Sequence, residues 1–298
     1  MSNAAYTSRQ IIIETNRRSA TSIPKGIDVL ITVLIYALLI LIAILVIIPL
    51  IWIIGSSFNP SSSLLSATAI PKNPTLMHYK RLFTETKFLQ WYWNTLKIAI
   101  ANMILSVVLT TMTGYIFSRF KFRGKKIALL SILVLQMFPS FMGMIAIYML
   151  LWQLQLLDNH LGLILVYAAG QIPYNTWLVK GYMASIPKSF DEAAKLDGAS
   201  NMTIFTKIIL PLMKPIITFV ALTQFMAPWM DFIFPRLILS SNSKKTLAIG
   251  LFDLIAGNTN NNFTMFAAGA VLVAVPITIL YVALQRYLLE GLIAGANK

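Results

Sequence analysis

The chain has 298 residues, of which 57% are hydrophobic and only 11% are charged, and its formal net charge is +14. Soluble domains are about 25% charged, so this composition excludes a chain whose main solvent is water. The chain has no cysteine, which excludes a disulfide framework and a thiolate metal site.

Apolar blocks of about 20 residues, enough to cross a hydrocarbon core of about 30 Å, recur along the chain and predict an all-α membrane protein. The first block carries no charge and is too long for a signal peptide, so we expect it to be retained. The fourth and fifth blocks contain polar residues and are assigned more from their spacing. The six predicted transmembrane helices are Val29–Ile54, Ile98–Phe117, Ile127–Leu151, Leu161–Leu178, Pro215–Leu239 and Phe263–Leu284.

The distribution of Lys and Arg predicts the orientation, because cytoplasmic loops carry an excess of these residues. With both termini in the cytoplasm, 16 of the 24 basic residues fall on the inner face and 8 on the outer face. We therefore expect a cytoplasmic segment at residues 1–28, a transmembrane domain at 29–290 and a cytoplasmic tail at 291–298. Proline inside the third and fourth predicted helices, at Pro139 and Pro173, is expected to kink them.

The basic run Arg119–Lys126 alternates with aromatic residues, a pattern that could bind nucleic acid through phosphate contacts and base stacking. It is a tight loop between two predicted transmembrane helices, and we interpret it as a topological anchor rather than a nucleic-acid site. The outer segments, residues 55–93 and 240–262, are predicted to be solvated loops or a docking surface for an external partner.

No constellation of residues for catalysis is found in the sequence. His78 and His160 are isolated, which favours structural or solvated roles over a metal site. No phosphate-binding loop is present, so the chain is not expected to hydrolyse ATP by itself. Asp231 is the one acidic residue inside the predicted transmembrane helices, and a single carboxylate does not favour a proton relay.

The segment 180–214, here called the 180–214 loop, is predicted to form two short cytoplasmic helices. Ser189 and Glu192 have the spacing of a capping box, and Asp191 and Lys195 have that of a favourable ion pair. Gly198 suits the left-handed position that ends a helix. A second helix is predicted to start at Ser200, with Met202, Phe205 and Ile208 or Ile209 along one apolar face.

The order of residues in this loop resembles the "EAA" motif of permease subunits of ATP-binding-cassette importers. The matching residues are Glu192, Ala193, Ala194, Asp197, Gly198, Ala199, Ile208, Leu210, Pro211 and Pro215. The resemblance implies that the loop is a coupling helix that inserts into a cleft of the ATP-hydrolysing subunit. It further implies that Glu192 pairs with a basic residue of that subunit, that Gly198 makes the turn, and that Met202 and Phe205 seat the loop.

The segments 225–236, 266–269 and 291–295 resemble the carbohydrate-importer branch of that family, of the maltose or maltodextrin type. The resemblance implies a type I importer fold, a homologous second permease, a dimer of ATPases that holds ATP and Mg, and an extracellular sugar-binding protein. This chain would itself bind no cofactor and no metal. The substrate would be maltodextrin or another oligosaccharide, of the raffinose, galactan or alginate type. The chain ends at Lys298, where relatives often continue, so a role of the tail in the ATPase dimer is not expected.

Four polar or aromatic residues within the predicted helices are candidates for lining the path of the substrate: Trp229, Asp231, Gln171 and Asn175. An aromatic belt would also explain Trp229, and contacts between helices would also explain the two amides. Two other classes of protein remain as alternatives. An ion-coupled secondary transporter would show inverted repeats and buried carboxylates, and an intramembrane enzyme would show a catalytic cluster.

Overall fold

The computed structural model describes residues 25–62, 68–137, 139–256 and 262–296, and all regular elements in these ranges are helical. Most of the predicted N-terminal segment and the end of the predicted C-terminal tail lie outside the described residues. The chain divides into two compact units, Met1–Ile53 and Ile54–Lys298.

The first unit contains most of α2 (Lys25–Ser57), a helix of 33 residues that spans about 50 Å at 1.5 Å per residue. It carries no charge between Val29 and Ile54, and it is long and apolar enough to cross a membrane. The first predicted transmembrane helix is therefore present as a continuous helix, with Pro49 inside it.

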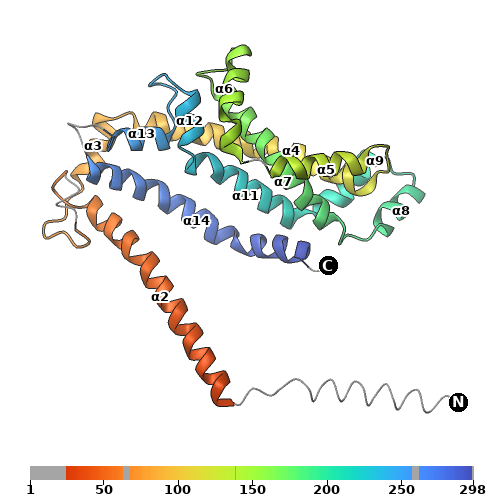
Figure 1. Ribbon diagram of the computed structural model, residues 1–298, viewed down its shortest axis with the longest axis horizontal. Helices are drawn as coiled ribbons and strands as arrows, with labels where there is room; N and C mark the ends of the chain where they lie inside the picture. Colours follow the sequence, from red (N-terminus) through yellow and green to blue (C-terminus); the bar gives the residue numbers. More distant parts are fainter. Residues whose placement is uncertain (1–24, 63–67, 138, 257–261, 297–298) are drawn as a thin grey trace. The chain divides into compact units, whose positions relative to one another are not determined.

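Four long helices form the body of the second unit: α4 (Phe88–Arg119), α7 (His160–Met183), α11 (Lys214–Met230) and α14 (Phe263–Ala296). Helix α4 packs most extensively against α7 and α11, and α11 also packs against α14 (Figure 1). The α4–α7 contact is close at Gly114, where an added Cβ atom would collide with the side chain of Val179. Small residues at such contacts are typical of packed membrane helices.

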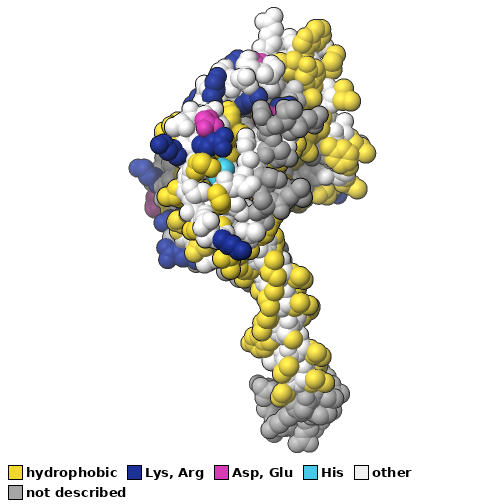
Figure 2. Space-filling view, turned by 90° about the vertical axis from the view of Figure 1, so that its left-hand side faces the viewer, with side chains coloured by type: hydrophobic (Ala, Val, Ile, Leu, Met, Phe, Trp, Pro, Cys, Tyr) yellow, Lys and Arg dark blue, Asp and Glu magenta, His cyan; other side chains and the backbone are white. Residues whose placement is uncertain are grey.

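Shorter helices lie at the two ends of this body (Figure 1). One end carries α3 (Met77–Glu85) and α13 (Leu247–Asp253), and Figure 2 shows Lys and Arg side chains on the face seen from that side. The other end carries the four helical segments of the 180–214 loop: α8 (Ser189–Leu196), α9 (Asn201–Thr203), η3 (Ile204–Ile209) and α10 (Leu210–Leu212).

The third predicted transmembrane helix is wrong as one continuous helix. The structure has α5 (Lys125–Gln136), a 3-10 turn η2 (Ser140–Gly143) and α6 (Met144–Gln153), and the two arms of this segment are bent by 88°. Pro139 directly precedes the turn. Proline has no N–H and clashes with the preceding helical turn. The sequence predicts a kink at Pro139, and the structure shows a break between two helices instead.

The fifth predicted helix, Pro215–Leu239, is also wrong as one helix, because α11 ends at Met230 and α12 (Ile233–Ile238) begins after a break. Pro173 lies inside α7, which remains one helix throughout.

Six transmembrane helices are not confirmed. Among the described residues, three helices are long and apolar enough to cross a membrane, and up to five if each bent pair counts as one. Helix α7 has sufficient length at 24 residues, but its polar side chains reduce its hydropathy.

Candidate functional site

The 180–214 loop forms the predicted pair of short helices joined by a turn. Gly198 has a φ of 80°, the left-handed conformation that glycine adopts without steric cost, and it follows Asp197, the C-cap residue of α8. The second helix starts as predicted at Ser200, whose side-chain oxygen accepts a hydrogen bond of 3.2 Å from the backbone N–H of Thr203.

The predicted capping box at the start of α8 is wrong. Lys188 precedes the helix in an already helical conformation, and Ser189 is the first helical residue, so its side chain does not cap the helix. A capping serine needs an extended backbone so that its hydroxyl can reach the N–H groups of the first turn. Here the chain enters α8 without leaving the helical region.

Arg119, at the last residue of α4, holds α8 in place. Its Nε lies 2.9 Å from Oδ2 of Asp191, and its Nη atoms donate to the carbonyl oxygens of Met183 (3.3 Å) and Ile186 (2.9 Å). The side chains of Arg119 and Asp191 are only 7% and 11% exposed. One guanidinium therefore connects the end of α4, the end of α7 and the first turn of α8.

We call these contacts of Arg119 with Asp191, Met183 and Ile186 the clamp, and they correct two sequence-based interpretations. Arg119 is not only part of a basic anchor, and the partner of Asp191 is Arg119 rather than Lys195. Lys195 lies on the exposed side of α8, whereas Asp191 faces the end of the helical body. Asp191 is thus a functional candidate whose role the sequence did not reveal.

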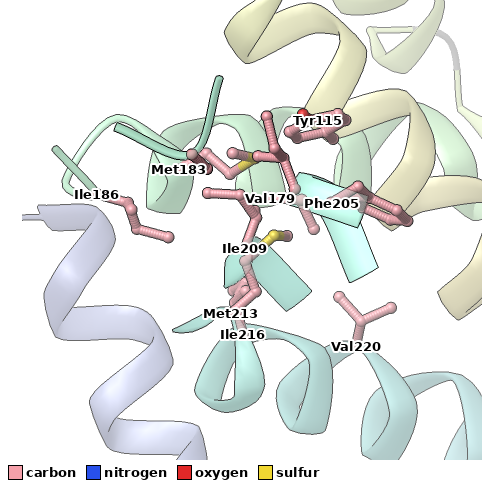
Figure 3. Close-up of a cluster of buried hydrophobic side chains, with 11 residues drawn as sticks. Tyr115, Val179, Met183, Ile186, Phe205, Ile209, Met213, Ile216 and Val220 are labelled. Atoms are coloured by element: carbon pink, nitrogen blue, oxygen red, sulfur yellow. The ribbon is translucent and has the colours of Figure 1, made fainter. Parts of the chain in front are cut away.

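An apolar cluster seats the loop against the long helices (Figure 3). Phe205 packs on Tyr115 of α4 with ring centroids 4.9 Å apart. The cluster is completed by buried residues of the loop and of α7 and α11: Val179, Met183, Ile186, Ala194, Ile204, Ile209, Met213, Ile216 and Val220.

The segment η3 is a π-helical turn, and this geometry explains how the loop presents its apolar side chains inward. Bonding from residue i to i+5 widens the helix, so Ile204 and Ile209 come near the same face, and both are buried. Such turns are frequent at functional sites. Beyond α10, the chain bends by 79° into α11.

The residues of the "EAA" resemblance divide into an exposed set and a buried set. Ala194 is 6% exposed and Phe205 9% exposed, and both pack within this chain, so they leave no surface for a partner. Ala194, one of the residues that match the motif, therefore packs against this chain and does not lie at the surface of the loop. The residues left on the surface are Glu192, Ala193, Asp197, Gly198, Met202 and Pro211, and we call this set the exposed face of the loop.

The candidate path residues Trp229 and Asp231 lie where α11 ends. Trp229 is 9% exposed and packs on Tyr92, with ring centroids 5.2 Å apart. Asp231 Oδ1 accepts the backbone N–H of Ile233 at 2.9 Å, and its Oδ2 accepts the hydroxyl of Tyr167 at 2.9 Å. These contacts give Asp231 a structural role, because its side chain binds backbone N–H groups of the first turn of α12 and the hydroxyl of Tyr167 on α7.

We expect Asp231→Ala to lower the stability of the protein by about 1 kcal/mol, the usual cost of a lost cap, and Asp231→Asn to have a much smaller effect. The amide oxygen of asparagine can accept the same backbone N–H. Thermal unfolding of the detergent-purified protein measures both. An alanine variant that keeps its stability but takes up sugar with a higher KM would instead assign Asp231 to the substrate path.

The two amides of α7 have different surroundings. Asn175 is 1% exposed, and its side-chain atoms have no hydrogen-bond partner among the described residues, whereas Gln171 is exposed. Another buried polar contact joins α4 and α11. Asn102 donates to the backbone oxygen of Gln224 at 2.7 Å. Sequence reasoning missed this contact, although the helical spacing of Asn102, Ser106 and Thr110 was visible on α4.

Both histidines have structural roles, as expected. His160 Nε2 lies 2.8 Å from the carbonyl oxygen of Lys244. His78 is fully buried against Thr264 of α14, and burial lowers the pKa of His78. In the described part of the chain, no group of three or more His, Cys, Asp and Glu side chains could hold a metal ion.

Comparison with known proteins adds to this geometry. A family model described as "Binding-protein-dependent transport system inner membrane component" matches residues 106–293. The chain is 45% identical over 266 residues to the galactooligosaccharides transport system permease protein GanQ of Bacillus subtilis (strain 168), covering 88% of this chain and 94% of that protein. It is 40% identical over 263 residues to the maltodextrin transport system permease protein MdxG of the same organism, covering 88% and 95%.

Among solved structures, a chain of a bacterial ABC transporter involved in the import of the acidic polysaccharide alginate superimposes with a TM-score of 0.79. The match covers 90% of this chain and 99% of that chain at 24% sequence identity. At this identity the likeness shows the fold alone.

Proposed function

Because the chain belongs to the family of binding-protein-dependent transport system inner membrane components, we propose that it is the permease subunit through which an ATP-binding-cassette importer moves an oligosaccharide. The observation that carries this proposal is the 45% identity to a sugar permease over 88% of the chain. The subunit is non-catalytic, and ATP and Mg bind to partner ATPases.

We assign the contact with the ATPase to the exposed face of the loop, with Glu192 as the charged group and Met202 as the apolar one. The burial pattern supports this assignment, because the same loop is fixed from behind by the Arg119–Asp191 pair and the apolar cluster. Because the ion pair and the apolar cluster both fix the loop to the long helices, a displacement of the loop would move α4, α7 and α11 rather than deform the loop itself.

The proposed assembly pairs this chain with a homologous permease, places both on a dimer of ATPases, and receives substrate from an extracellular sugar-binding protein. The family description, which is of binding-protein-dependent systems, supports this arrangement. Both termini then lie in the cytoplasm, as the positive-inside rule predicts. Substrate outside and ATP inside would favour different states of one helical bundle.

We propose galactooligosaccharides or maltodextrins as the substrate class. The two relatives that support this proposal differ by only five percentage points in identity to this chain, 45% against 40%, and they transport these two classes by name. A sugar path through neutral groups is compatible with the buried amides and hydroxyls of α4 and α11.

The test is an ATPase assay on the complete complex, reconstituted in vesicles with its binding protein. We expect galactooligosaccharides or maltodextrins to stimulate ATP hydrolysis several-fold and to be taken up, while alginate oligosaccharides do neither. A matched preparation with an ATPase subunit unable to hydrolyse ATP serves as the control. Uptake in that control, driven by an ion gradient alone, would contradict the proposal.

A further inference from the structure

A pocket of about 1020 Å³ lies at the same end of the second unit as the 180–214 loop. Its walls come from the end of α4, the turn that follows, the first turns of α5, the end of α7 and the chain that enters α8. Because α4, which is long and apolar enough to cross a membrane, ends here, we place the pocket at the surface of the bilayer.

The pocket is strongly basic. No residue of its lining, all of which lies in the described part of the chain, is acidic. Arg119 contributes to the wall, but its charge is matched by Asp191. Five lysines also line the pocket: Lys121, Lys125, Lys126, Lys180 and Lys188. Like charges this close to each other repel, so an anion that neutralises them is bound favourably.

One of the five lysines is held against the wall of the pocket by an aromatic ring. Lys180 Nζ lies over the ring of Trp177, 4.9 Å from its centroid, which fixes this cation against the wall.

The remaining wall is apolar and continues along the outside of α5. Ile127 and Leu130 line the pocket and are 72% and 49% exposed, and Val134 follows at helical spacing with 51% exposed. An apolar stripe that leads away from a lysine cluster fits a molecule with an anionic head and a hydrocarbon tail. It does not fit a free anion or an acidic segment of a soluble protein.

We propose that this pocket binds the phosphate headgroup of an anionic phospholipid, with an acyl chain along the Ile127–Leu130–Val134 stripe. Basic pockets between membrane helices are a recurring means of holding such headgroups. The bound lipid would fill the space between the turn after α4 and the entry into the 180–214 loop. It would thereby stabilise the position from which that loop contacts its partner.

Native mass spectrometry of the complete detergent-purified complex, titrated with phosphatidylglycerol, tests the proposal. We expect the triple variant Lys121→Gln, Lys126→Gln, Lys188→Gln to bind phosphatidylglycerol at least tenfold and up to about 100-fold more weakly, since each lysine contributes about fivefold. All three side chains are exposed, so the variant should fold normally, which thermal unfolding verifies.

The matched control is Lys72→Gln, Lys80→Gln, Lys87→Gln, which removes the same charge from exposed lysines outside the pocket and should leave binding unchanged. Phosphatidylcholine and inorganic phosphate are the comparison ligands. Equal loss of lipid in both triple variants would overturn the proposal. So would binding of phosphatidylcholine as tight as that of phosphatidylglycerol, or displacement of the lipid by equimolar inorganic phosphate.

Discussion

Replacing Arg119 with Met should lower the free energy of unfolding by about 3–5 kcal/mol, the usual cost of breaking a buried ion pair from one side. The substitution leaves the Asp191 carboxylate buried without its cation and removes the donors to the carbonyl oxygens of Met183 and Ile186. Thermal unfolding of the purified complex measures the loss. We also expect uptake to fall further than substrate binding, because the 180–214 loop loses its fixed position.

Three further variants separate the clamp from a general effect of charge. Arg119→Lys should be intermediate, because lysine keeps the charge but cannot reach three acceptors with one planar group. Combining Arg119→Met with Asp191→Asn should restore part of the stability, since no buried charge remains unpaired. Arg81→Met breaks an exposed ion pair with Glu85 and should cost under about 1 kcal/mol. Equal losses for Arg81→Met and Arg119→Met would contradict the clamp.

The helical class, the membrane character and the local shape of the 180–214 loop could be predicted because they depend on neighbouring residues. Apolar blocks of sufficient length predict membrane helices. Gly198 and Ser200 each act within one turn of their own position, and both were placed correctly. The breaks at Pro139 and after Met230 were harder to predict. Proline marks a position of weakness, but the size of the bend depends on what packs around it.

The clamp and the cluster behind the loop could not be predicted, because they bring together residues far apart in the sequence. Arg119 belongs to a basic run whose charges suit an anchor, and nothing near it in the sequence names Asp191 as its partner. Ala194 and Glu192 are two positions apart in one motif, yet one faces the core and the other faces outward. Only the position of α8 against α4 and α7 decides which residues of the motif remain for a partner.

Of the acidic residues within α8, Glu192 is the one whose side chain is exposed. Its neighbour Asp191 is occupied by Arg119, and Asp197 follows the last residue of the helix. An exposed carboxylate on a rigidly seated helix loses little conformational freedom when it meets a basic residue of an ATPase. The proposed contact therefore depends on this one charge more than on any other residue of the exposed face of the loop.

We expect Glu192→Lys to weaken the binding of the ATPase by about 30-fold or more, since disrupting a hydrogen-bonded charge pair at an interface costs about 2–5 kcal/mol. Uptake should fall with it, while the thermal stability of the permease stays unchanged, because the side chain is exposed. Copurification of the ATPase and uptake in vesicles measure the two effects. Glu85→Lys, the same charge reversal on α3 at the other end of the helical body, should leave both nearly unchanged. If both variants assemble and transport alike, the ATPase does not depend on Glu192, and the exposed face of the loop is not its docking surface.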